Sequence, residues 1–482
     1  MSQKRGEIKL YACNLANQEG ETIDLSTMAP QIDIYENIFE TFITATVAIT
    51  DALNVLERFR LFGSEYVHIK LAQVEGVGED AAKEFTIDKN LRVYKISRNE
   101  KTVSSGQGYL LHLIDPRAFF TAKQRLSTTY RGAISDIIAN LCVDKAHISK
   151  EEFDLFEATK PDNLSFTIPN WSVLETIQYL EKQALTMDNS GVWANPFFFY
   201  QTVNGGFRFT SIDSMVQNKF PIEFTMNVAR AADTDNTTPM EDKEKGVNSQ
   251  ILNVDIPKRF DMIEGVTQGA FAGRKDSYDL LTKISKEVIY NIDDVYKRSH
   301  GKIGFPLIRT EDDFEKVVRA EETIDEDTPP TFSEIDVDTA LHKSYDSYFT
   351  RSYNMSHQHD NNNDYTSTEV FREVDFNSNS AESFERNSMI QMLHQNMFKI
   401  TIPGRTDISC GLVMHANIPL IQVDDNIIKN PFDDQQYLIT GIKFEFKIAD
   451  KESRCVIECV KHSNAAKIED AQFVEALADP AD

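Results

Sequence analysis

Short segments that alternate apolar and polar residues restrict most strongly how this chain can fold. In EYVHIKLAQV, residues 65–74, Val67, Ile69 and Leu71 fall on one face. A period of two is that of a half-buried β-strand. The segment IFETFITATVAITD, residues 38–51, has a similar pattern at Phe42, Ala45, Val47 and Ile49. Several such segments with turns between them, over residues 31–118, predict a small barrel or sandwich.

Residues 119–212 interrupt this pattern with two helical segments. YRGAISDIIANLCVDK has helical periodicity at Ile134, Ile137, Ile138 and Leu141. In SFTIPNWSVLETIQYLEKQAL, residues 165–185, Ser172 and Glu175 have the spacing of a capping box, which satisfies free amides at a helix start. Trp171, just before that box, is expected to pack into the same module. We therefore predict a compact α/β module.

The module is expected to end in a hairpin. GVWANPFFFYQTVNGGFRFTS reads as a strand, a turn at 204–206 and a returning strand. Asn-Gly at the turn favours the left-handed backbone conformations that tight hairpins use.

The remaining sequence is β-rich apart from one polar region. SYDLLTKISKEVIYNIDD fits neither period well, but its β-branched residues favour a strand. AESFERNSMIQMLHQ predicts a helix, and further strands follow it. Residues 301–385 are the most polar and acidic part, with loop-like runs such as SHQHDNNNDYTS. The last residues, 466–482, are expected to form an acidic C-terminal tail.

Two segments suggest an internal duplication. LRVYKISRNEKTVSSGQGYLLHLID and QYLITGIKFEFKIADKESRCVIECV each read as a strand, a charged turn and a strand. Each is preceded by a strand, a link containing Gly63 or Gly411, and another strand. Any two meanders can be aligned in this way, so the layout alone leaves the duplication open. A true duplication would give two similar barrels with the α/β module inserted between them.

Composition excludes several classes of protein. A chain of 482 residues is too long for one core, and about two to four domains are expected. The net charge of −26 argues against a protein that reads nucleic-acid sequence, which needs a basic face. The N-terminus has no apolar signal region and no segment has the roughly 20 apolar residues of a membrane span. We therefore expect neither export nor membrane insertion.

The sequence predicts no catalytic, cofactor-binding or metal-ligating residue. The five cysteines match no zinc spacing, and Cys455 and Cys459 read as strand packing residues. Asp360–Asp364 begins like a calcium loop, but Tyr365 and Phe371 stand where Gly and Glu are required. His357 and His359 lie in a polar loop, and Gly269–Gly273 lacks the Lys-Ser or Lys-Thr of a phosphate loop. These features favour a structural or interaction protein that needs no cofactor.

The order of several segments resembles a known family, the central baseplate hub proteins of contractile-tailed, T-even-like phages. The hub part of type VI secretion VgrG spikes is a more distant relative. The matching pieces are QIDIYENIFETFITATVAITDALNVLERFRLFGSEYVHIKL, STTYRGAISDIIANLCVDK followed by SFTIPNWSVLETIQYLEKQAL, and FKITIPGRTDISCGLVMHANIP with YLITGIKFEF. Val173 stands where a proline is common in the family. The pieces cover about two thirds of the chain, and residues 301–385 have no counterpart.

This resemblance implies a fold class, mainly β with an α/β insertion, with two tube-type β-barrels per chain. Three chains would form a pseudo-hexameric homotrimer ring. The ring would join the six-fold tail tube, or its initiator, to the three-fold central spike, and would contact neighbouring baseplate wedge proteins. DNA would pass through its channel without specific binding. The location implied is the virion tail baseplate, after assembly in the host cytoplasm.

The resulting domain map has five parts. We expect a first tube-like barrel at 1–118, the inserted α/β domain at 119–212 and a second tube-like barrel from 213–300 and 386–465. The acidic insertion is 301–385 and the tail is 466–482. Two alternatives stay open: a tail-tip protein that binds a host receptor, and a hub with a peptidoglycan hydrolase activity placed in 301–385.

Overall fold

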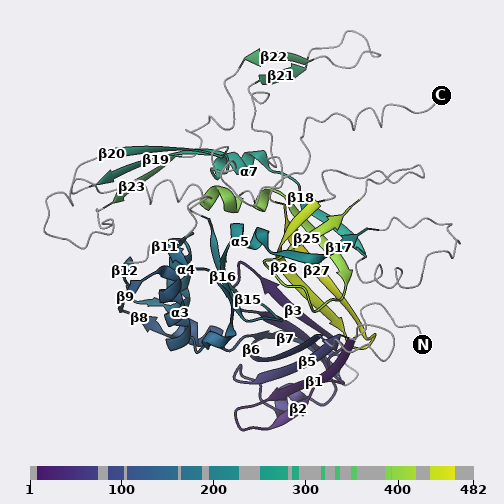
Figure 1. Ribbon diagram of the computed structural model, residues 1–482. Coiled ribbons are helices and arrows are strands. Elements are labelled where there is room, and N and C mark those ends of the chain that lie inside the picture. The colour runs from purple at the N-terminus through teal and green to yellow at the C-terminus, as the bar shows by residue number, and fades with distance from the viewer. Residues whose placement is uncertain are drawn as a thin grey trace, which may run out of the picture. The chain divides into compact units, whose positions relative to one another are not determined.

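The computed structural model shows a mainly β chain in two compact units (Figure 1). It describes residues 8–73, 85–102, 106–160, 164–186, 195–226, 250–279, 285–292, 316–320, 332–336, 349–354, 386–391, 393–418 and 435–461. The first unit comprises residues 1–184, 197–257 and 397–461. The second comprises residues 185–196, 258–396 and 462–482.

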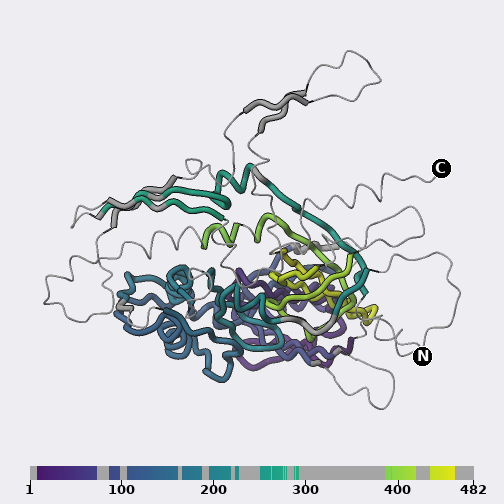
Figure 2. The backbone as a smooth tube through the Cα atoms, turned by 45° about the horizontal axis from the view of Figure 1, so that its top comes forward, coloured from purple at the N-terminus to yellow at the C-terminus, as the bar shows by residue number. Residues whose placement is uncertain are grey.

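A large, mainly antiparallel sheet with one parallel strand pair organises the first unit. Its N-terminal elements are β1 (Ile8–Ala16), β2 (Thr22–Asp24), β3 (Gln31–Asn37), β4 (Thr44–Asp51), α1 (Val55–Arg58), β5 (Tyr66–Gln73), β6 (Phe85–Thr102) and β7 (Gly106–Ile114). Its later strands are β17 (Lys219–Thr225), β18 (Asn253–Lys258), β24 (Met397–Pro403), β25 (Val413–Asn417), β26 (Gln435–Lys447) and β27 (Glu452–Val460). The order is β18-β24-β27-β26-β3-β4-β7-β6-β5-β1-β2, with β25 also on β26 and β17 on β25. Strands from the N-terminal and the C-terminal parts of the sequence therefore lie side by side where β26 pairs with β3, seen as purple and yellow segments in Figure 2.

The alternation in the sequence corresponds to buried positions of this sheet. Val67, Ile69 and Leu71 on β5 are buried, as are Ala45 and Val47 on β4. Cys455 and Cys459 are buried residues of β27, and all five cysteines are free thiols. The prediction of half-buried strands in these segments is confirmed.

Two quartets of strands share one pairing scheme. We call β4–β7 the N-terminal quartet and β24–β27 the C-terminal quartet. In each, the first strand pairs with the fourth, the second with the third, and the third with the fourth. This is the duplication that the sequence layout left open.

Local details match between the quartets as well. The third strand is bulged opposite the penultimate residue of the fourth, at Tyr94 in one quartet and Thr440 in the other. Just before each bulge, the Val93 N–H donates to the Glu65 carbonyl and the Ile439 N–H to the Leu412 carbonyl, both at 2.9 Å. Such bulges are specific features that shared ancestry preserves.

The region between β7 and β17 contains the two predicted helices. Its elements are α2 (Arg117–Lys123), β8 (Arg125–Leu126), β9 (Thr129–Gly132), α3 (Ile134–Asp144), the 3-10 turn η1 (Lys150–Glu152), β10 (Phe153–Phe156), β11 (Thr159–Lys160), β12 (Leu164–Thr167), β13 (Trp171–Ser172), α4 (Val173–Glu181), β14 (Leu185–Thr186), β15 (Phe197–Gln201), β16 (Phe207–Ser211) and α5 (Ile212–Gln217). The apolar faces of α3 and α4 share one core with the Phe side chains of β15 and β16.

The start of α4 has the predicted capping box. The Glu175 N–H donates to Ser172 Oγ at 3.1 Å, and the Ser172 N–H donates to Glu175 Oε2 at 2.7 Å. Asn170 turns the chain in the left-handed region, with φ 57°. Trp171 is half-buried against the module core, with its ring 5.0 Å from the ring of Tyr179. The predicted packing of Trp171 is confirmed.

The β15–β16 hairpin forms, but its glycines have a different role from the one predicted. Neither Gly205 nor Gly206 has a positive φ. A Cβ on Gly206 would lie 1.6 Å from the Glu152 carbonyl oxygen. Because the five-residue connection allows other turn geometries, the left-handed turn was the wrong reason. The glycine instead permits close approach of two backbones.

The second unit contains shorter elements. They are α7 (Met262–Thr267), β19 (Ala272–Asp279), β20 (Ser285–Asn291), β21 (Lys316–Ala320), β22 (Phe332–Asp336), β23 (Phe349–Asn354) and helical residues within 386–395. β19 pairs with β20 and β23, and β21 pairs with β22. The strand expected near residue 288 and the helix expected near residue 390 are therefore present.

Candidate functional site

A buried carboxylate joins the β15–β16 hairpin to the central sheet. Glu36 lies on β3, between the two quartets, and its side chain is buried. It accepts hydrogen bonds from the Val203 N–H at 2.7 Å and from the Cys410 N–H. Burial raises the pKa of Glu36, although both hydrogen bonds oppose the rise. This one side chain therefore connects β3, the inserted hairpin and the loop before β25.

The hairpin makes a second set of contacts with the same loop. Arg208 donates from Nη1 to the Cys410 carbonyl at 3.0 Å and from Nε to Asp154 Oδ2 at 2.6 Å. The Tyr200 hydroxyl donates to the same Cys410 carbonyl at 3.4 Å. We call Glu36, Tyr200, Val203, Arg208 and Cys410 the buried junction. It holds the inserted module to the C-terminal quartet.

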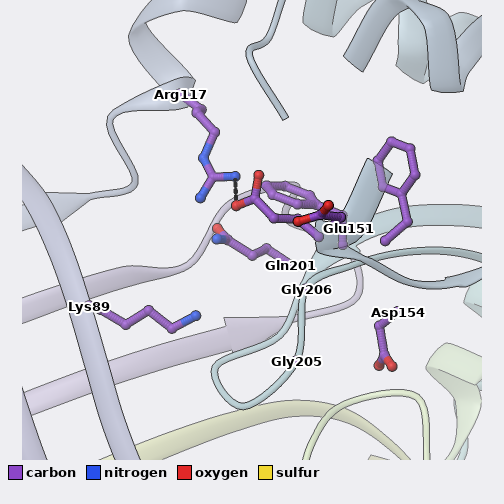
Figure 3. Close-up of a pocket in the computed structure, with 10 residues that line it drawn as sticks. Lys89, Arg117, Glu151, Asp154, Gln201, Gly205 and Gly206 are labelled. Carbon is purple, nitrogen blue, oxygen red and sulfur yellow. Dashed lines mark hydrogen bonds and ion pairs between the residues drawn. The ribbon is translucent and has the colours of Figure 1, made fainter. Parts of the chain in front are cut away.

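Next to this junction lies a polar pocket of about 450 Å³ (Figure 3). The labelled side chains in Figure 3 include Lys89 from β6, Arg117 from α2 and Asp154 from β10. The lining residues are Lys89, Arg117, Glu151, Glu152, Phe153, Asp154, Gln201, Gly205, Gly206 and Phe207. The pocket therefore lies where the N-terminal quartet meets the inserted module.

Most of the charge in the pocket is paired. Arg117 bonds Glu152 Oε1 at 2.6 Å and Asp115 Oδ1 at 3.0 Å, and its guanidinium lies 5.0 Å from the centre of the Phe207 ring. Burial acts against the ionised form of Glu152, but the Ser149 N–H and Arg117 hold its pKa below the ordinary value. These pairs close the wall of the pocket.

Lys89 is the exception among the cations that line the pocket. Within the described part of the chain it has no hydrogen-bond or ion-pair partner, and its side chain points into the pocket (Figure 3). Burial lowers the pKa of Lys89, and the nearby Asp115 partly offsets this effect. The arrangement can hold a polar group, but it does not pair a nucleophile with a base.

Of the metal-like and phosphate-like sequence motifs, Gly269–Gly273 is the one within the described residues, and it forms the turn after α7 and the start of β19. Gly269 has φ 72° and ends the turn after α7, while Ala270, Phe271 and Ala272 are buried. His357, His359 and 360–364 lie outside the described residues. Among the residues that the structure describes, no group of three His, Cys, Asp or Glu side chains could hold a metal ion. Likewise, no helix of that described part is long and apolar enough to cross a membrane.

Sequence reasoning missed the buried junction, although one signal was present. In QIDIYENIF, Glu36 has the same parity as Ile32 and Ile34, the buried face of β3. A charged residue at a core position of an alternating strand is expected to have a specific partner. Its partners, at Val203 and Cys410, are distant in sequence and carry no comparable signal.

A second buried carboxyl gives the module a testable pH dependence. Glu181, at the end of α4, accepts the Phe199 N–H at 2.8 Å, and burial raises its pKa to about 8. The pKa of Glu181 is higher in the folded protein than in the unfolded chain, so its protonated side chain stabilises the fold fully below about pH 4.5. That stabilisation is lost as the pH rises through about 8. Gln does not ionise, so we expect Glu181→Gln to remove that loss. The melting temperature of the variant should therefore rise relative to that of the wild type between pH 5 and pH 9.

Differential scanning calorimetry of the two proteins across this range tests the expectation. Glu175→Gln is the matched control, since Glu175 is an exposed residue of the same helix. A constant difference between wild type and Glu181→Gln at every pH would contradict a raised pKa for Glu181.

Comparison with known proteins finds similar solved structures at low sequence identity. A tail protein of Neisseria meningitidis aligns with a TM-score of 0.47 at 10% identity, over 93% of this chain and 96% of its own. A 43 kDa tail protein of a Shewanella oneidensis prophage aligns with a TM-score of 0.48 at 10% identity, over 93% and 98%. An Escherichia coli type VI secretion component, described as similar to phage T4 tail proteins gp27 and gp5, aligns with a TM-score of 0.39 at 9% identity, over 95% and 77%.

These structural neighbours are phage tail proteins and a tail-like secretion component. No protein-family model matches the chain, and no curated protein sequence matches it.

Proposed function

We propose that the chain is a non-enzymatic, structural baseplate hub subunit of a contractile tail. Three copies form a ring that adapts the six-fold tail tube to the three-fold central spike. Each quartet is the framework of one tube-type barrel, so three chains present six similar units. The barrels are assigned to residues 1–118 and, within the expected 213–300 and 386–465, to the parts that belong to the first unit, 213–257 and 397–461.

The observation that carries this proposal is the matched pairing of the two quartets. A chain with two equivalent strand units can be three-fold by subunit and six-fold by unit, which is what a symmetry adaptor needs. The shared bulge and the matching Val93 and Ile439 hydrogen bonds support the equivalence of the units. A receptor-binding protein or an enzyme has no requirement for such an internal repeat.

The inserted module, 119–212, has a bracing role in this proposal. The buried junction attaches it to the C-terminal quartet, and Gln201 attaches it to the N-terminal side. Gln201 accepts the Ile43 N–H at 3.2 Å and donates to Asp115 Oδ2 at 2.8 Å. A module fixed to both halves of the sheet would hold the two repeats in one orientation.

The proposed ring also encloses a channel that DNA crosses without being held. Duplex DNA carries about one negative charge per 1.7 Å of axis, so a basic bore would retain it. The net charge of −26 supplies enough acidic residues for a neutral or acidic bore.

Solution mass and spike binding test the proposed function. Light scattering at micromolar concentration should give three times the chain mass of 54.9 kDa. The trimer should also bind the central spike protein of the same particle at one trimer per spike trimer. A protein that stays monomeric alone and with the spike would refute the hub role. A zone of lysis in a murein zymogram would favour the hydrolase alternative.

A further inference from the structure

The two quartets are equivalent, but the third strand of the C-terminal quartet is paired on both edges, whereas that of the N-terminal quartet is paired on one edge over the equivalent stretch. In the C-terminal quartet, residues 441–447 of β26 pair with β27 on one side and β3 on the other. The equivalent stretch of β6 begins at Lys95, just after the Tyr94 bulge, and pairs with β7. In the described part of the chain, the opposite edge of β6 has no paired strand beyond Val93, whose N–H donates to the Glu65 carbonyl. That edge is therefore open where β26 is occupied.

The strand that corresponds to β3 also has an open edge, and it is β18, at one end of the sheet. β3 lies beside β4, the first strand of its quartet, and β18 lies beside β24, the first strand of the other. β3 has β26 on its second edge, whereas β18 ends the sheet in the described part of the chain. The occupied pair β26–β3 and the open pair β6 and β18 are thus equivalent.

The register of this equivalence can be read from the ladders. Thr44 and Met397 pair with the last residues of β7 and β27, so Ala48 and Thr401, each four residues later, correspond. Gln31 pairs with Ala48, and the Leu252 N–H donates to the Thr401 carbonyl at 2.8 Å. Leu252 therefore corresponds to Gln31. Gln250, which leads into β18, pairs parallel with Thr225 of β17, and β17 is parallel to β25 and so antiparallel to β24. With β18 antiparallel to β24, as β3 is to β4, Val254 corresponds to Asp33 and Ile256 to Tyr35.

We propose that β18 of one copy pairs with the open edge of β6 in the next copy, in the register of β3 on β26. Tyr35 pairs with Lys443, which corresponds to Ser97, so Ser97 lies opposite Ile256 of the next copy. Asp33 pairs with Glu445, which corresponds to Glu100, so Glu100 lies opposite Val254 of the next copy. The inference deepens the proposed ring and rests on it for the number of copies.

The β3–β26 ladder within the chain shows that two edges of this kind fit together, which favours a second copy as the occupant. Pro257 corresponds to Glu36 and lacks an N–H, so the ladder with β6 has one hydrogen bond fewer at that position. A head-to-tail contact of this kind uses two different edges, so it closes into a ring when the rotation allows.

Cysteine cross-linking tests the register in the full-length protein. The Ile38 N–H donates to the Thr440 carbonyl, so 35 and 443 form a non-hydrogen-bonded pair on the β3–β26 ladder. Such pairs have Cα atoms about 4.5 Å apart, within the range of a disulfide. The variant with Ser97→Cys and Ile256→Cys should therefore cross-link between subunits under oxidised glutathione. The five native cysteines are buried and should give little background.

The matched control is Ser97→Cys with Asp255→Cys, which is slipped by one residue and places its side chains on opposite faces. A second pair, Glu100→Cys with Val254→Cys, tests the same register if the first variant does not fold. Cross-linking in both designed pairs, at least tenfold above the control, supports the pairing. Equal cross-linking in the control, or none in a pair whose reduced form has the wild-type mass, overturns it.

The same experiment separates this inference from the proposed function. A wild-type trimer without cross-linking in the designed pairs would refute the edge pairing and leave the hub role standing. A covalent ladder that runs beyond three subunits would support the edge pairing and refute the closed trimer. A wild-type monomer with no cross-linking would refute both.

Discussion

Gly411→Ala is expected to destabilise the first unit by about 2–6 kcal/mol. Gly411 has φ 77°, where a side chain costs roughly 1–3 kcal/mol of backbone strain. Its Cβ would also lie 2.0 Å from the Tyr200 hydroxyl oxygen, which is buried in the junction. Overpacking of this kind typically adds about 1–3 kcal/mol. Urea unfolding followed by circular dichroism measures the loss.

The internal repeat supplies a matched control for that substitution. Gly63 has φ 89° at the corresponding link, but a Cβ there meets nothing closer than 3.6 Å. Gly63→Ala should therefore show the strain without the collision, at about 1–3 kcal/mol. Tyr200→Phe in the Gly411→Ala background removes the clashing oxygen and should recover part of the loss. Equal costs for the two alanine variants would show that the junction tolerates the extra methyl group.

The alternation of the strands and the periodicity of the helices could be predicted from the sequence because both are local. Val67, Ile69 and Leu71 report one strand face, and the Ser172 and Glu175 pair reports one helix start. The repeat could be suspected from the layout around Gly63 and Gly411. Recognising it needed the pairing itself, since each quartet is closed by its first and fourth strands, as Thr44 with Ile114 and Met397 with Val460, and local sequence does not specify those partners.

The buried junction could not be predicted for the same reason. Arg208 reaches the carbonyl of Cys410, and Glu36 reaches the amides of Val203 and Cys410, across three separate parts of the chain. Gly205 and Gly206 in the hairpin turn are a second case in which local sequence did not give the physical reason for a residue. Asn-Gly-Gly predicts a turn by local conformational preference, but Gly206 is required by its approach to Glu152. Long-range contacts thus changed the reason for a feature that local sequence had located correctly.

Glu36→Ala is expected to lower the free energy of unfolding by about 2–6 kcal/mol and to loosen the attachment of the inserted hairpin. The substitution leaves the Val203 and Cys410 amides without their acceptor in a buried site, and each unsatisfied donor costs roughly 1–3 kcal/mol. Both amides should then exchange hydrogen faster, while those of α3 keep their protection. Glu36→Gln is the matched control, because its amide oxygen can still accept one of the two bonds and its loss should be intermediate. If Glu36→Ala unfolds at the wild-type urea concentration with unchanged exchange at both amides, Glu36 does not hold the hairpin. The brace would then depend on Arg208 and Gln201 instead, and Arg208→Ala should show the larger loss.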